Sequence, residues 1–120
     1  MTLRECYAAL GGDYDDALGR LRSEKLVTKF VLRFLDDKSY DLLCSSMEAK
    51  NYEEAFRAAH TIKGVCSNLA FTVLGRSSSE LSEALRHGYT PGADALAEQV
   101  KEEYRQTVAA IRAYQEASGE

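Results

Sequence analysis

The chain has 120 residues, 45% of them hydrophobic and 28% charged, so we expect one soluble globular domain with a hydrophobic core. Its net charge of -4 argues against a nucleic-acid binder, which would show a basic stripe, and against binding to an anionic membrane surface. The three cysteines have no C-x-x-C spacing, so we expect neither a disulfide framework nor a zinc site, and we place the protein in the reducing cytoplasm. No apolar run reaches the length of a membrane span, and the charged N-terminus does not resemble a signal peptide.

The first third of the chain is predicted to form short helices, because its apolar residues recur with helical spacing. Residues 2–10 and 14–20 each show such a pattern. Ser23 is a candidate cap for a longer helix that runs to about Asp36. The apolar stripe of that helix consists of Val27, Phe30, Val31 and Phe34. We expect residues 1–37 to cover one end of the remaining fold.

Four further helical patterns follow, over about 39–49, 51–69, 71–87 and 90–117. Asn51 is expected to cap the second of them with Glu54 as its capping-box partner, and Thr90-Pro91 to open the last as N-cap and first helical residue. Because the connections are only a few residues long, consecutive helices should be antiparallel neighbours. We therefore predict an all-α fold, an up-and-down antiparallel four-helix bundle over residues 38–117 with short additional N-terminal helices, in a single domain of residues 1–120.

The helix over 51–69 can be oriented from its own sequence. Its apolar positions recur at spacings of four and three, which marks the side that packs in the bundle: Ala55, Ala59, Ile62, Cys66 and Leu69. At about 100° per residue, His60, Gly64 and Ser67 lie roughly 120–180° from this stripe and should face solvent. Lys63 and Phe56 lie about 80–100° from it and should flank the exposed side.

Gly64 is the residue on this exposed side that most needs an explanation. A glycine inside a helix costs about 1 kcal/mol relative to alanine, and this one is not near a helix end. We favour close approach by another molecule as the reason. The neighbouring residues also have plain structural interpretations. A solvent-facing histidine such as His60 is usually passive, Lys63 can be a solvated charge, and an aromatic such as Phe56 is more often the edge of a core than a docking site.

The segment Ala59-His60-Thr61-Ile62-Lys63-Gly64, followed by Asn68-Leu69, resembles the signature of histidine-containing phosphotransfer (Hpt) domains, which carry phosphoryl groups in two-component phosphorelays. The resemblance extends back to Asn51-Tyr52-Glu53-Glu54-Ala55 and forward to Leu74, Ser78, Leu81 and Glu83. Two positions depart from the family pattern, which often has glycine in place of Ala70 and alanine in place of Ser78. Neither position belongs to the histidine motif.

The resemblance implies a function for the exposed side. His60 would be the phospho-acceptor, Lys63 would offset charge on the phosphoryl oxygens, and Gly64 would leave room for the partner. The partner-binding residues would be Phe56, Arg57 and Ser67. The partners implied are response-regulator receiver domains, with a hybrid histidine kinase as a further one. The chain would act as a monomeric, stoichiometric phosphorelay intermediate that needs no cofactor, and not as an enzyme.

Two other interpretations stay open. One is a helical interaction module of the same shape that binds a partner without carrying phosphate. The other is an enzyme with a metal in the bundle core, which requires inward carboxylates and Glu-x-x-His pairs. The residue three before His60 is Arg57 and the residue three before His87 is Ala84, so the pattern favours no metal site.

Overall fold

Helices make up all the regular structure in residues 1–119, which are the residues that the computed structural model describes. No strand occurs in this range, so the predicted all-α class is confirmed. In chain order the helices are α1 (Leu3–Leu10), α2 (Tyr14–Leu21), α3 (Glu24–Arg33), the 3-10 helix η1 (Phe34–Asp36), α4 (Ser39–Glu48), α5 (Tyr52–Leu69), α6 (Thr72–Leu85) and α7 (Ala93–Ser118).

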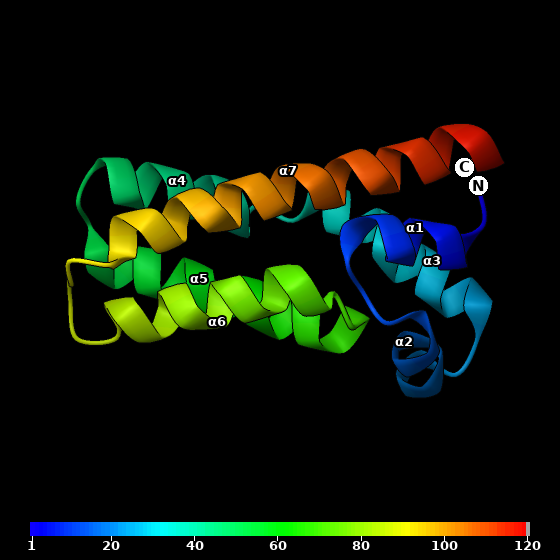
Figure 1. The fold of residues 1–120 in the computed structure, drawn as a ribbon, viewed down its shortest axis with the longest axis horizontal. Coiled ribbons are helices and arrows are strands. Elements are labelled where there is room, and N and C mark those ends of the chain that lie inside the picture. Colours follow the sequence, from blue (N-terminus) through cyan, green and yellow to red (C-terminus); the bar gives the residue numbers. More distant parts are fainter. Residues whose placement is uncertain (120) are drawn as a thin grey trace.

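Helices α4 to α7 form an elongated bundle. α5 packs against α4 and against α6, and α6 in turn packs against α7. Successive helices run in opposite directions along the long axis, and the loop from α6 to α7 lies at the left end of the view (Figure 1). Only Ala70 and Phe71 separate α5 from α6, and so short a connection forces the two helices to lie side by side.

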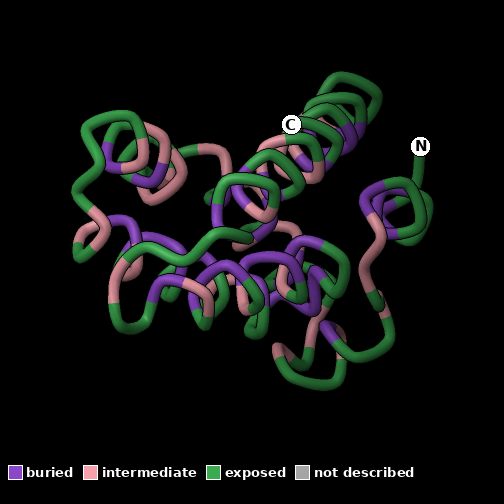
Figure 2. The backbone as a smooth tube through the Cα atoms, turned by 60° about the vertical axis from the view of Figure 1, so that its left-hand side comes forward, coloured by how far each residue is buried: buried purple, intermediate pink, exposed green. Residues whose placement is uncertain are grey.

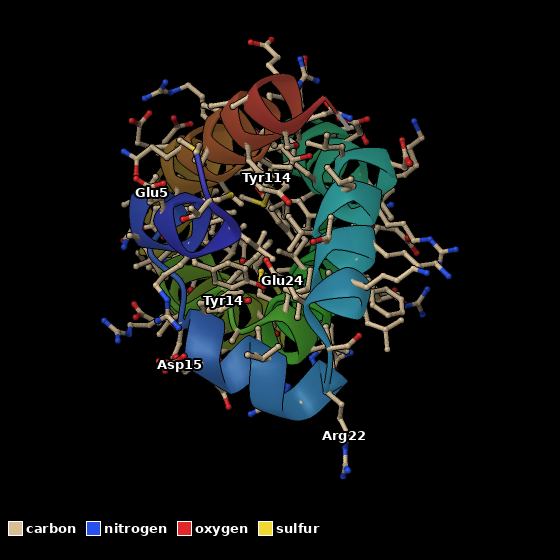
Figure 3. All side chains as sticks on the ribbon, turned by 90° about the vertical axis from the view of Figure 1, so that its right-hand side faces the viewer. Glu5, Tyr14, Asp15, Arg22, Glu24 and Tyr114 are labelled. Carbon is tan, nitrogen blue, oxygen red and sulfur yellow. The ribbon has the colours of Figure 1, made fainter. Side chains whose placement is uncertain are left out.

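The three short N-terminal helices gather at the opposite end of the bundle (Figures 1 and 3). Each begins after a polar residue whose side chain accepts a hydrogen bond from the backbone, namely Thr2, Asp13 and Ser23. α1 packs along α7, where the Cys6 thiol donates to the Ala110 carbonyl at 3.5 Å. Figure 3 shows Tyr14 of α2 and Tyr114 of α7 on the inner side of this end, while Arg22 projects outward.

The predicted apolar stripe of α5 is buried, and α6 also buries one side. None of the five stripe residues of α5 is more than 4% exposed. The buried stripe of α6 consists of Leu74, Ser78, Leu81 and Leu85, with Phe71 just before it. Phe30, expected on the stripe of α3, is only partly buried, as are Leu96 and Tyr104 of α7. Figure 2 shows buried stretches alternating with exposed ones along the helices, as expected when one side of each helix faces a core.

The contact between α5 and α6 depends on a glycine. A Cβ placed on Gly75 of α6 would lie 3.2 Å from the Cβ of Cys66 on α5, which is tighter than an ordinary van der Waals contact. Without a side chain at this position, the two helices pack closely along their buried sides. Burial raises the pKa of the Cys66 thiol to about 12, which keeps this cysteine protonated and unreactive.

The end of α5 is a tight turn with a left-handed residue. Ala70 has φ 56° and ψ 39°, a conformation that crowds a Cβ and therefore favours glycine. The Phe71 N–H donates to the Cys66 carbonyl at 2.9 Å, and the Tyr7 hydroxyl of α1 donates to the Leu69 carbonyl at 2.8 Å. The positive φ gives a physical reason for the glycine that Hpt-like sequences often have at this position.

The start of α7 differs from the prediction. The helix begins at Ala93 with Gly92 as its N-cap, so Thr90 and Pro91 do not open it. The Thr90 hydroxyl donates instead to the Ala84 carbonyl near the end of α6, at 2.9 Å. The Thr90 side chain is thus directed toward the end of α6, and no side chain caps the start of α7.

The N-terminus of α5 carries half of the predicted capping box. The Asn51 side chain accepts a hydrogen bond from the Glu54 N–H at 3.3 Å, as expected. The Glu54 carboxylate, however, accepts from the Arg57 guanidinium at 2.9 Å. The Asn51 N–H donates to the Ser46 carbonyl at 2.8 Å, so both groups of the return bond are engaged elsewhere.

Candidate functional site

The exposed side of α5 carries the histidine motif. His60, Lys63, Gly64 and Ser67 are all exposed, and Phe56 is partly buried beside them. This orientation follows from the buried stripe on the other side of the helix, because rotating α5 would bring that stripe into water. The structure therefore groups His60, Lys63 and Gly64 within about one helical turn, as the spacing predicted.

The His60 imidazole is accessible and makes one contact with another ring. Among the side-chain hydrogen bonds and ion pairs formed within residues 1–119, none involves this ring, so neither of its nitrogens is engaged there. The ring centroid lies 5.9 Å from that of Phe56, with 24° between the planes. This geometry is an offset stack between residues four apart on the helix.

Lys63 contributes a cation that is not paired within the described part of the chain. No carboxylate of residues 1–119 forms an ion pair with its ammonium group. The Glu83 carboxylate of α6 accepts hydrogen bonds from the Arg86 guanidinium at 3.1–3.3 Å, and these bonds hold the pKa of Glu83 below its usual value. The charges of Arg86, His87 and Lys63 lower the pKa of Glu83 further, so Lys63 lies near enough to Glu83 to act on its charge without pairing with it.

Gly64 opens the helix surface next to the histidine. Apart from its chain neighbours and the adjoining backbone of α5, a Cβ placed on Gly64 would meet no atom of residues 1–119 within 4 Å. No side chain of the described chain therefore requires glycine at this position, in contrast to Gly75. The helix surface between Lys63 and Ser67 is left bare, and another molecule can approach the backbone there.

The sequence pattern of the Hpt domain matches residues 26–113, which is most of the chain. The chain belongs to the Hpt domain family. Hpt domains are phosphotransfer carriers of two-component relays and not classical enzymes, and they interact there with receiver domains and kinases. Neither the curated proteins nor the solved structures gave a match to this chain.

Arg57 of this Hpt domain is more constrained than its position suggests. It lies one turn before His60, and its guanidinium donates to the carboxylates of Glu53 and Glu54, at 2.9 Å in each case. Its charge is therefore balanced by two acids of the same helix. A contact between Arg57 and a partner stays a prediction, as does one from Ser67.

Two hollows lie beyond Gly64, where α2 crosses the end of α5. One, of about 290 Å³, is bordered by Lys63 and Ser67 of α5 and by residues of α2 and α6. The other, of about 400 Å³, lies between α2, α3 and α5 and has largely apolar walls with Val65 and Asn68 among them. Arg20 of α2 lines both hollows, while its guanidinium donates to Asp16 at 3.0 Å.

Sequence reasoning missed Arg86, which lies over the Phe56 ring with 5.5 Å between its guanidinium carbon and the ring centroid. Arg86 was not part of the motif, and nothing in the helix pattern of α6 marks it. The antiparallel register, in which Gly75 faces Cys66, brings the end of α6 beside the start of α5. The contact between Arg86 and Phe56 could have been predicted from that register, but the register is a property of the tertiary structure.

Across residues 1–119, no helix is both long enough and apolar enough to cross a membrane. No group of three or more histidine, cysteine, aspartate or glutamate side chains is placed in that range so that it could hold a metal ion.

Proposed function

We propose that this Hpt domain is a phosphorelay intermediate in which His60 accepts a phosphoryl group from a receiver-domain aspartate and passes it to another receiver. The observation that carries the proposal is the exposed, unpaired imidazole of His60 next to a helix-interior glycine that no other part of the described chain requires. A passive surface histidine explains the exposure of the ring, but it does not explain Gly64.

The chemistry requires a neutral imidazole with a free ring nitrogen. The lone pair of that nitrogen forms the N–P bond while the O–P bond of the aspartyl phosphate breaks, and the aspartate leaves as a carboxylate. The reverse steps deliver the group to a second aspartate, so there is no net change in the carrier. Lys63 lies on the same side of α5 as His60, where its ammonium group would offset charge on the phosphoryl oxygens.

The remaining groups would serve docking. The bare surface at Gly64 would admit the loops that surround the receiver's aspartate, and Phe56, Arg57 and Ser67 would border the contact. The carrier would work as a monomer with receiver domains and a hybrid histidine kinase as partners. Its catalytic contribution would be limited to a nucleophile and a cation in fixed positions.

Incubation of the purified chain with receiver domains phosphorylated by a small-molecule donor tests the proposal. We expect phosphate that is labile in acid and stable in alkali on the wild-type chain, and none on His60→Gln. The chain has two histidines, so His87→Gln is the matched control and should label like the wild type. Labelling of His60→Gln would refute His60 as the acceptor. Receiver binding without any labelling of the wild type would favour an interaction module.

A further inference from the structure

The His60 ring is held by an aromatic neighbour and by no hydrogen bond within residues 1–119. An exposed side chain without directional contacts changes rotamer on the picosecond to nanosecond scale. The imidazole does stack on the ring of Phe56, one turn earlier on α5, with 5.9 Å between the centroids and 24° between the planes. A stack of this kind favours one orientation of the imidazole over the others.

Phe56 is itself fixed from the neighbouring helix. The guanidinium carbon of Arg86 lies 5.5 Å from the centroid of the Phe56 ring, within the range of a cation–π contact. Three hydrogen bonds of 3.1–3.3 Å to the Glu83 carboxylate hold the guanidinium in place. The contacts thus form a chain from Glu83 and Arg86 on α6, through Phe56, to His60 on α5.

We propose that Phe56 is a positioning residue for His60, and that Arg86 supports it by holding the Phe56 ring. This inference rests on the proposed function, since the orientation of the imidazole matters only if its nitrogen reacts. It changes the role expected for Phe56, which the sequence assigned to partner binding. In a transfer between two proteins, the attacking nitrogen must lie in line with the bond that breaks, and a ring of fixed orientation satisfies this in more of the encounters.

A positioning role and a docking role give different kinetics. The rate of transfer at saturating receiver reports the reactive geometry, and the receiver concentration at half-saturation reports docking. For Phe56→Leu we expect the transfer rate at saturating receiver to fall by roughly tenfold, with little change in the receiver concentration at half-saturation. This loss is smaller than the roughly 100-fold loss expected when a reacting group is held permanently out of place, because the freed imidazole still visits the reactive orientation. Phe56→Tyr keeps a ring that can stack, and it should restore the rate.

Nuclear magnetic resonance of the unphosphorylated chain gives a readout that does not depend on transfer. The side-chain coupling constants of His60 should indicate one dominant rotamer in the wild type and in Phe56→Tyr, and averaged rotamers in Phe56→Leu. A single dominant rotamer in all three proteins would overturn the inference, because the ring would then be held by something other than Phe56.

The contribution of Arg86 is tested by Arg86→Gln. We expect the saturating rate to fall by about two- to fivefold, the size of an exposed cation–π contact, and the His60 couplings to shift toward averaged values. The control is Arg105→Gln on α7, because Arg105 pairs with Glu102 at the same spacing as Arg86 with Glu83. Equal effects of the two variants would show that Arg86 acts only through general charge.

These outcomes separate the inference from the function on which it rests. If the wild-type chain takes no phosphate, the proposed function fails, whatever the couplings show. If the wild type and Phe56→Leu transfer at the same saturating rate, the function stands and the positioning role is wrong. A change confined to half-saturation would return Phe56 to the docking surface and equally contradict the proposal.

Discussion

Gly64 lies in the interior of α5 and Gly75 near the start of α6, on two helices that lie side by side, yet their surroundings are opposite. A Cβ at Gly75 would lie 3.2 Å from the Cβ of Cys66, whereas a Cβ at Gly64 would meet nothing within 4 Å in residues 1–119. Glycine costs about 1 kcal/mol relative to alanine in a helix interior such as that around Gly64, and no more than this near the start of α6. Close packing of α5 on α6 offsets this cost at Gly75, but nothing in the described chain offsets it at Gly64.

The difference shows that packing within the chain shapes one side of α5, whereas nothing in the described chain requires glycine on the other side, where we propose that a partner approaches. The buried side, around Cys66, is determined by packing against the other helices. The exposed side presents His60 and Lys63 without hydrogen bonds or ion pairs in residues 1–119. The exposed side of α7 is built in another way, since Lys101 there pairs with Glu98 at 3.2 Å. The charge of Lys101 on α7 is thus paired, whereas that of Lys63 next to Gly64 has no ion-pair partner in residues 1–119.

Among the variants that test the difference between the two glycines, Gly64→Leu should have the largest effect on transfer. A side chain over the bare surface would keep the receiver's aspartate from His60, and we expect transfer to fall by roughly 100-fold or more. The helix itself should gain stability, by about 0.5–1 kcal/mol, because leucine is a better helix former than glycine. Transfer kinetics and urea unfolding measure the two effects. Normal transfer by Gly64→Leu would show that nothing approaches this surface.

Lys63→Ala should have the next largest effect. Removal of a cation beside the phosphoryl group should slow transfer by about tenfold. Removal of a buried stabilising group would slow a reaction more, but Lys63 is exposed and solvent screens its charge. The free energy of unfolding should stay within about 0.5 kcal/mol of the wild type. Lys101→Ala is the control for a change of net charge, and equal slowing by both variants would contradict a local role for Lys63.

Alanine at each glycine tests the packing half of the comparison. Gly64→Ala should raise the free energy of unfolding by about 1 kcal/mol, since the new methyl group meets no obstacle. Gly75→Ala gains no more helix propensity than this and must also separate α5 from α6, so its unfolding free energy should lie at least about 1 kcal/mol below that of Gly64→Ala. Chemical denaturation of both variants decides the point, and equal gains would refute the packing role of Gly75.

Ser78→Ala tests the packing of the buried side of α6 and should have a small effect on stability. Ser78 is fully buried, and its hydroxyl finds no hydrogen-bond partner in residues 1–119. Removing an unsatisfied hydroxyl should raise the free energy of unfolding by about 1 kcal/mol or slightly less. Ser77→Ala is the control, because the Ser77 hydroxyl donates to the Leu74 carbonyl at 3.2 Å and its loss should give no gain. Thermal unfolding of the two variants would reveal the difference.

Much of the candidate site could be predicted from local sequence. The spacing of four and three along α5 determines which residues are buried, and the exposure of His60, Lys63 and Gly64 follows from the same periodicity. Helix ends were harder to predict, because Thr90 could serve either the end of α6 or the start of α7. The left-handed conformation of Ala70 was also unexpected, since alanine rarely adopts it and the sign of it was the glycine that Hpt-like sequences often have there.

The sequence by itself determined the helices, their buried sides and the exposed position of the histidine, because these depend on residues at most a few turns apart. Only the tertiary structure decided that Arg86 covers Phe56, that Gly75 serves packing and Gly64 does not, and that α2 crosses the end of α5. These features depend on how far one helix slides along another. That register is set by the fit of side chains across the core, which no single helix encodes.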